Sequence, residues 1–79
     1  MNKQEILAKM QDIFRDVLNN DDIVLTEETT AQDIEEWNSL TQVQLITTIE
    51  HEFNIRFSLM EMMNWTKVGE IAAGIQGKL

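Results

Sequence analysis

The side chain best placed to do chemistry is the hydroxyl of Ser39, which stands at the start of a predicted helix. A serine in this place is most often a cap that accepts hydrogen bonds from the first helical turn. The preceding residue, Asn38, is an equally good cap, so Ser39 can keep a free hydroxyl. A phosphodiester formed there would lie beside unsatisfied backbone N–H groups and the positive end of the helix dipole. The sequence therefore permits phosphate-type modification of Ser39.

Catalytic and metal-binding alternatives fail on spacing. Ser39 and His51, the single histidine, are 12 residues apart on one predicted helix. At about 1.5 Å per residue they are about 18 Å apart, whereas a nucleophile and its base need hydrogen-bond distance. The acidic segment 19–22 lacks the alternating acids and the glycine of a calcium-binding loop. The chain has no cysteine, which excludes a disulfide and a cysteine-based metal site. From the spacing and the missing motifs we expect neither an enzyme nor a metal site.

The charge distribution is one-sided. The net charge is −8, and no lysine or arginine occurs between residues 16 and 53. The ten acids of that segment are Asp16, Asp21, Asp22, Glu27, Glu28, Asp33, Glu35, Glu36, Glu50 and Glu52. Such a field repels nucleic acid and attracts basic protein surfaces. The 79 residues also show no membrane-spanning run and no signal peptide, which indicates one domain over residues 1–79 in the cytoplasm.

Helical periodicity covers most of the chain. Asn2 and Glu5 form a predicted capping box, and apolar residues then recur at helical spacing as far as Leu18. Turn-forming residues at 19–22 end this first helix. The connection to Trp37 is longer than most loops, which favours a packed or functional segment. Its apolar anchors are expected to be Ile23, Val24, Leu25 and Ile34.

The second helix is predicted from Ser39 to about Phe53, and it shows two apolar arcs. The wider arc, expected to face the core, consists of Leu45, Ile46, Ile49 and Phe53. The narrower arc consists of Leu40, Val43 and Thr47. Gln42 lies near the helix start, where it could reach the preceding loop. Either the helix is buried on both sides or the narrower arc faces a partner, and a chain of this length favours the partner.

Two shorter helices complete the pattern. Ser58 and Glu61 form a second predicted capping box, which opens a short third helix through Met63. A last helix is predicted to start at Thr66 and to be weakened by its glycines, each by about 1 kcal/mol relative to alanine. Its inward residues are Val68, Ile71, Ala72 and Ile75, and the expected core fillers before it are Met60, Met62, Met63 and Trp65. The fold class is therefore all-α, a four-helix bundle with a long first loop.

Together, the acidic loop, Trp37-Asn38-Ser39-Leu40 and the apolar spacing that follows resemble an acyl carrier protein over nearly the whole chain. The resemblance implies 4′-phosphopantetheine on Ser39, flanked by Asn38 and Leu40, which carries acyl or aminoacyl groups as thioesters. It implies a monomer, with partners comprising a phosphopantetheinyl transferase, a loading ligase and acyl-transferring enzymes with basic surfaces. The implied partner-binding residues are Glu36, Trp37, Leu40, Val43, Gln44, Thr47, Glu50 and His51. The implied acyl cleft involves Thr47, Met62 and Trp65.

Some residues depart from the usual pattern of that family. Asn38 stands where an aspartate is common, and Thr41, Gln44 and His51 replace acids that fatty-acid carriers show. With Trp37 before the serine, the motif is more similar to specialised stand-alone carriers and peptide-synthetase-like modules than to fatty-acid carriers. A short or polar cargo is expected from Trp37, from the polar Gln44 and Thr47, and from the bulky Met62 and Trp65 near the implied cleft. The alternative function is an acidic helical adaptor that binds a basic partner without a prosthetic group.

Overall fold

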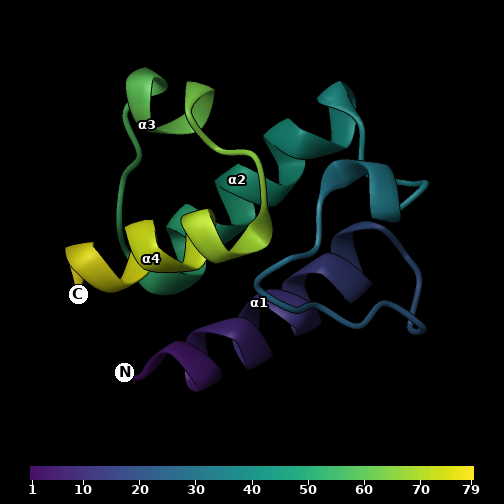
Figure 1. The fold of residues 1–79 in the computed structure, drawn as a ribbon, viewed down its shortest axis with the longest axis horizontal. Coiled ribbons are helices and arrows are strands. Elements are labelled where there is room, and N and C mark those ends of the chain that lie inside the picture. The colour runs from purple at the N-terminus through teal and green to yellow at the C-terminus, as the bar shows by residue number, and fades with distance from the viewer.

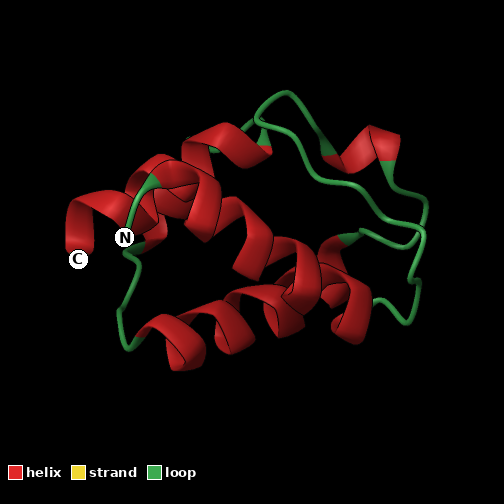
Figure 2. Ribbon diagram, turned by 90° about the horizontal axis from the view of Figure 1, so that it is seen from below, coloured by secondary structure: helices red, strands yellow, loops and turns green.

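A computed structural model describes residues 1–79 as helices and connections, with no strand (Figures 1 and 2). The elements in chain order are α1 (Lys3–Val17), the 3-10 helix η1 (Ala31–Asp33), α2 (Ser39–Phe53), α3 (Leu59–Met63) and α4 (Val68–Lys78). The predicted all-α class is therefore confirmed. No helix is both long enough and apolar enough to cross a membrane.

The core lies where α1 packs against α2 and α4. α1 contributes Ile6, Met10, Ile13 and Phe14, which its helical spacing places on one face. The wider arc of α2 is buried as predicted, from Leu45 to Phe53. Leu40 and Val43 remain 80% and 65% exposed, so α2 is not buried on both sides.

Three α-helix starts are held by side-chain caps, which are Asn2, Asn38 and Ser58. The predicted boxes Asn2–Glu5 and Ser58–Glu61 are both present. The backbone N–H of Ser58, together with Lys78, holds the pKa of the Glu61 carboxyl below its usual value.

The start of the last helix differs from the prediction. α4 begins at Val68, not at Thr66, because the Glu70 carboxylate accepts hydrogen bonds from the backbone N–H groups of both Thr66 and Lys67. Thr66 therefore lies before the helix, and its hydroxyl donates to the same carboxylate oxygen at 2.6 Å. The Thr66 hydroxyl is the main cause that lowers the pKa of Glu70, and the Thr66 N–H adds to it.

The connection between α1 and α2 is bound to α1 by side chains that reach its backbone. Gln11 Oε1 accepts from the N–H of Leu25 at 3.0 Å, and Arg15 Nε donates to the carbonyl of Ile23 at 2.8 Å. Ile23 and Leu25 are buried, whereas Val24 is 68% exposed. The prediction that Val24 anchors the connection is wrong, since successive residues of an extended segment point to opposite sides.

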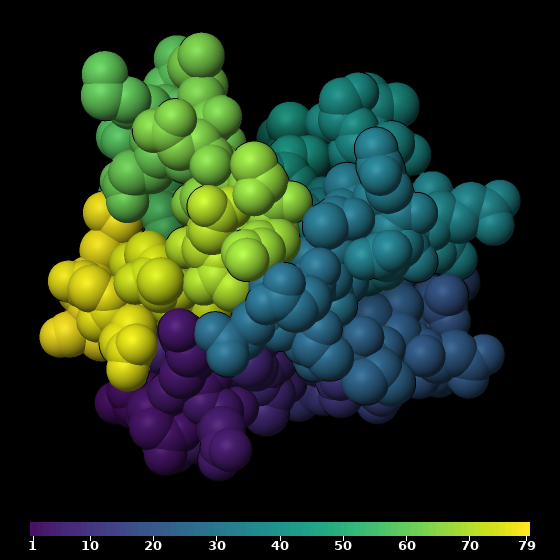
Figure 3. Space-filling view, in the orientation of Figure 1, coloured from purple at the N-terminus to yellow at the C-terminus, as the bar shows by residue number.

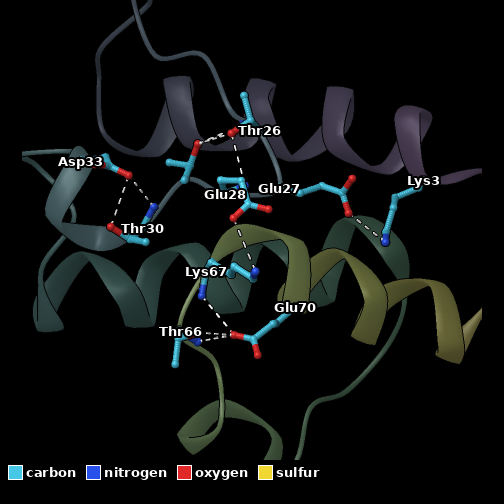
Figure 4. A network of polar contacts seen from close by, with 10 residues as sticks. Lys3, Thr26, Glu27, Glu28, Thr30, Asp33, Thr66, Lys67 and Glu70 are labelled. Atoms are coloured by element: carbon cyan, nitrogen blue, oxygen red, sulfur yellow. Dashed lines mark hydrogen bonds and ion pairs between the residues drawn. The ribbon is translucent and has the colours of Figure 1, made fainter.

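The same connection is bound to the start of α4 by backbone hydrogen bonds. The N–H groups of Val68 and Gly69 donate to the carbonyls of Thr29 and Glu27, at 2.8 and 2.9 Å. A Cβ at Gly69 would lie 2.9 Å from the Glu27 carbonyl oxygen, so the close approach requires glycine. The ion pairs Lys3–Glu27 and Lys67–Glu28 lie along this contact (Figure 4).

The methionines of α3 differ from the prediction. Met60 and Met63 are 75% and 76% exposed, and only Met62 packs against the core. A five-residue helix presents one narrow face to its neighbours, so its other side chains are exposed. Figure 1 shows α3 at the edge of the fold.

Candidate functional site

Ser39 is the first residue of α2, and its exposed hydroxyl makes no hydrogen bond within the chain. Asn38 takes the capping role, because its Oδ1 accepts from the N–H groups of Leu40 at 2.9 Å and Thr41 at 3.1 Å. The prediction that Asn38 caps the helix and leaves the Ser39 hydroxyl free is confirmed. Ser39 thus offers an unpaired nucleophilic oxygen at a helix start.

The expectation of several unsatisfied N–H groups near Ser39 is wrong. Besides the two N–H groups bound by the Asn38 side chain, the N–H of Gln42 donates to the Asn38 carbonyl at 2.8 Å. Only the N–H of Ser39 itself remains without a partner. The hydroxyl of Thr41 tightens the turn, because it accepts from the N–H of Asn38 and donates to the carbonyl of Glu36, both at 2.8 Å. Thr41 was a site residue missed from the sequence, although its position three after the cap is that of a capping box.

Trp37 is a core residue, so the prediction that it contacts a partner is wrong. Its ring is buried and meets Phe14 edge-on, with 5.0 Å between ring centroids. Its indole N–H donates to Gln42 Oε1, which confirms that Gln42 reaches the preceding loop. Glu36 is also held, because its carboxylate accepts from Asn20 Nδ2 at 3.1 Å. The two residues before the cap thus fix the loop that leads to Asn38 and to Ser39 at the start of α2.

A pocket of about 300 Å³ opens beside Ser39. It separates the start of α2 from the segment that joins α3 to α4, and Figure 3 shows the hollow between the teal and green parts of the surface. The lining residues are Ala31, Trp37, Asn38, Ser39, Gln42, Met62, Trp65, Thr66, Lys67 and Ile71. Met62 and Trp65 therefore form part of a wall and leave open space beside Ser39.

Thr47 does not belong to this pocket, so its prediction as a cleft residue is wrong. Its side chain is exposed, and its hydroxyl donates to the carbonyl of Val43 at 2.8 Å. It lines a separate polar hollow at the other end of α2, with Glu50, His51 and Arg56. The rise of the helix explains why Thr47 is not a cleft residue. At about 1.5 Å per residue, Thr47 lies about 12 Å along the helix axis from Ser39.

The remaining predicted partner residues lie along the outside of α2. Leu40, Val43, Gln44 and His51 are exposed. Glu50 is half-buried, and its carboxylate accepts from the N–H of Phe57 at 2.8 Å, so it also serves the fold. None of the acids of α2 takes part in an ion pair, whereas the acids Glu27, Glu28 and Glu61 do. No group of three acidic or histidine side chains is arranged to hold a metal ion.

Comparison with known proteins identifies the family of this chain. Residues 8–75 match the family model described as the phosphopantetheine attachment site. The fold superposes with a TM-score of 0.88 on the solution NMR structure of the holo acyl carrier protein from Geobacter metallireducens. The two sequences are 40% identical, over 92% of this chain and 84% of that chain. No curated protein matches the sequence.

The match over most of the chain sets aside the adaptor that would lack a prosthetic group. The partners of this chain are those of the family, a phosphopantetheinyl transferase and acyl-handling enzymes. The chain belongs to the phosphopantetheine-attachment family, and it is a non-catalytic acyl carrier whose acyl groups are held on covalently attached 4′-phosphopantetheine.

Proposed function

We propose that Ser39 carries the 4′-phosphopantetheine and that its thiol presents short acyl groups to partner enzymes. The observation that carries the assignment is the exposed, unpaired hydroxyl of Ser39 next to a helix cap that Asn38 already supplies. The hydroxyl of Ser58, by contrast, accepts from the N–H of Glu61 at 3.2 Å as the cap of α3. Ser39 is thus the serine free to react.

Modification by a transferase tests the assignment. Incubation with coenzyme A and a broad-specificity phosphopantetheinyl transferase should add one phosphopantetheine, measured by intact mass. Ser39→Ala should add none, whereas the matched control Ser58→Ala should still add one. Equal labelling of Ser39→Ala would refute the assignment.

The partner surface follows from the exposed side of α2. Leu40 and Val43 supply apolar contact area, and the surrounding acids attract a basic partner and speed its approach. The surface extends over Gln44, Thr47, Glu50 and His51. The transferase, a loading ligase and the acyl-transferring enzymes all approach this side of a monomeric carrier. The single domain over residues 1–79 and the cytoplasmic location stay predictions.

A specialised stand-alone carrier with a short cargo fits the site better than a fatty-acid carrier. Trp37 occupies the core behind the attachment point, and the pocket beside Ser39, about 300 Å³, lies at the lower end of the ~300–1,000 Å³ typical of ligand sites. An acyl group that stays in water does not stabilise the carrier, whereas a buried acyl group contributes about 0.8 kcal/mol of stability per CH₂.

The cargo class is tested by acyl chain length. Between an acetyl and a decanoyl group the eight additional CH₂ groups would contribute about 6 kcal/mol if all were buried. We expect thermal midpoints that hardly change from acetyl through hexanoyl to decanoyl. A steady rise with chain length would show that Met62 and Trp65 move aside, and it would return the protein to the fatty-acid type.

A further inference from the structure

The amide group of Gln42 has a fixed orientation that leaves its donor free. The indole N–H of Trp37 can only donate, so the atom that faces it must be Gln42 Oε1. The amide nitrogen Nε2 of Gln42 therefore turns away from Trp37, and it has no hydrogen-bond partner within the chain. Gln42 is half-buried and lines the pocket beside Ser39. No buried side-chain nitrogen or oxygen of the chain lacks a partner, so this nitrogen is open to solvent and free to donate to an acceptor that enters the pocket.

The rest of the pocket is suited to a ligand with both apolar and polar parts. Trp37, Met62, Trp65 and Ile71 provide apolar wall, and Trp65 is held by an edge-on contact with Phe57, with 4.7 Å between ring centroids. Among the other polar side chains of the wall before α4, Thr66 donates to Glu70, and Lys67 pairs with Glu28 at 3.5 Å. The Gln42 amide nitrogen is thus a donor in the pocket lining that has no partner within the chain.

Ser39 and Gln42 are three residues apart on α2, and both line the pocket. Side chains at this spacing are neighbours, with about 5–6 Å between their Cβ atoms. Anything attached to Ser39 Oγ thus starts at the rim of the pocket and passes Gln42 within its first few bonds. In 4′-phosphopantetheine the part that follows the phosphate is the pantoyl segment, which has two methyl groups, a hydroxyl and an amide carbonyl.

We propose that the pantoyl segment docks in this pocket, with its methyl groups against Met62 and Trp65 and one of its oxygens accepting a hydrogen bond from Gln42 Nε2. This inference rests on the proposed attachment at Ser39. Docking holds the near half of the arm on the carrier and leaves the thiol and its acyl group outside. A partner enzyme must then release the arm, or accept it docked, before the thioester can reach a distant active site.

The test compares apo and holo protein, with the added mass of phosphopantetheine verified first. In the wild type, the ¹H–¹⁵N resonances of the Gln42 side-chain NH₂ group should shift between the two forms. The thermal midpoint should also rise from apo to holo, by about 4–8 °C if the gain is that of one net hydrogen bond in a domain of this size.

The matched variants are Gln42→Glu and Gln44→Glu. Gln42→Glu keeps an oxygen for the Trp37 indole, removes the donor and adds one negative charge, and its apo form should stay folded. The rise from apo to holo should be lost in Gln42→Glu and kept in Gln44→Glu, which makes the same charge change on the exposed side of α2.

Two results would overturn the inference while leaving the attachment intact. One is an unchanged Gln42 NH₂ signal in protein whose mass shows the added group. The other is a Gln42 signal that shifts only when an acetyl or hexanoyl group is added to the thiol, which would make the pocket an acyl site. Absence of any added mass would instead refute the attachment at Ser39.

Discussion

Replacing Gly69 by alanine tests how strongly the long connection is bound to the start of α4. In an exposed helix interior this substitution stabilises the helix by about 1 kcal/mol. At Gly69 the new Cβ would lie 2.9 Å from the carbonyl oxygen and 3.0 Å from the Cβ of Glu27. Neither neighbour is the end of a flexible side chain, so the backbone of the connection must move.

The magnitude follows from the bonds that such a movement breaks. The N–H groups of Val68 and Gly69 donate to Thr29 and Glu27 across the same contact, and each hydrogen bond contributes about 0.5–1.5 kcal/mol. Overpacking of this kind typically costs about 1–3 kcal/mol. After the gain in helix propensity we expect a net destabilisation of about 1–2 kcal/mol, which corresponds to a fall in the thermal midpoint of about 4–16 °C.

Urea and thermal unfolding, followed by circular dichroism at 222 nm, measure the effect. Gly77→Ala is the matched control, because nothing lies within 4 Å of a Cβ at that position of the same helix. We expect this control to be neutral or slightly stabilising. If Gly69→Ala is as stable as Gly77→Ala, the connection moves at no cost and the proposed tight contact is refuted.

Three further predictions concern the docking side of α2, ionic strength and pH. Val43→Asp should leave the thermal midpoint almost unchanged but strongly reduce modification by the transferase, whereas Ile46→Asp should unfold the domain; comparable unfolding by both would exclude an exposed docking side. Added salt or millimolar Mg²⁺ should raise the thermal midpoint from a low-salt start, because it screens the acids of residues 16–53; a flat or falling midpoint would show that the fold already compensates them. The pKa values of Glu61 and Glu70 are lower in the folded protein than the value of about 4.5 in the unfolded chain. Their hydrogen bonds therefore stabilise the fold fully above about pH 4.5, and this stabilisation is lost as the pH falls through the folded-state pKa values. Glu61→Gln and Glu70→Gln should therefore flatten the acid limb of a plot of stability against pH, and an unchanged limb would contradict the assignment.

The helices were predictable because their signals are local. Apolar spacing marked the buried faces of α1 and α2, and the residue pairs Asn2–Glu5 and Ser58–Glu61 marked two helix starts. The cap at Asn38 was equally visible, since an asparagine before a helix needs no distant partner to act.

Other errors arose where the burial of a residue, or its place in a pocket, depends on a contact with residues far away in the chain. Whether Met60 and Met63 are buried depends on how a short helix lies on the bundle, which its own sequence does not encode. Trp37 read as a surface residue because the ring of Phe14, which buries it, is 23 positions away in the chain. The pocket beside Ser39 joins residues from both halves of the chain, so Lys67 and Ile71 could not be assigned to the site from spacing alone.

The two tryptophans of the chain both line the pocket beside Ser39, and the chain contains no tyrosine. Its ultraviolet-excited emission therefore comes almost entirely from two indoles that meet the same small volume. Trp37 is buried with its N–H engaged, whereas Trp65 is half-buried, so the two should emit at different wavelengths. The protein thus has a built-in optical probe: with Trp65→Phe and Trp37→Phe each leaving one emitter, the occupancy of the pocket can be followed in real time without any added label.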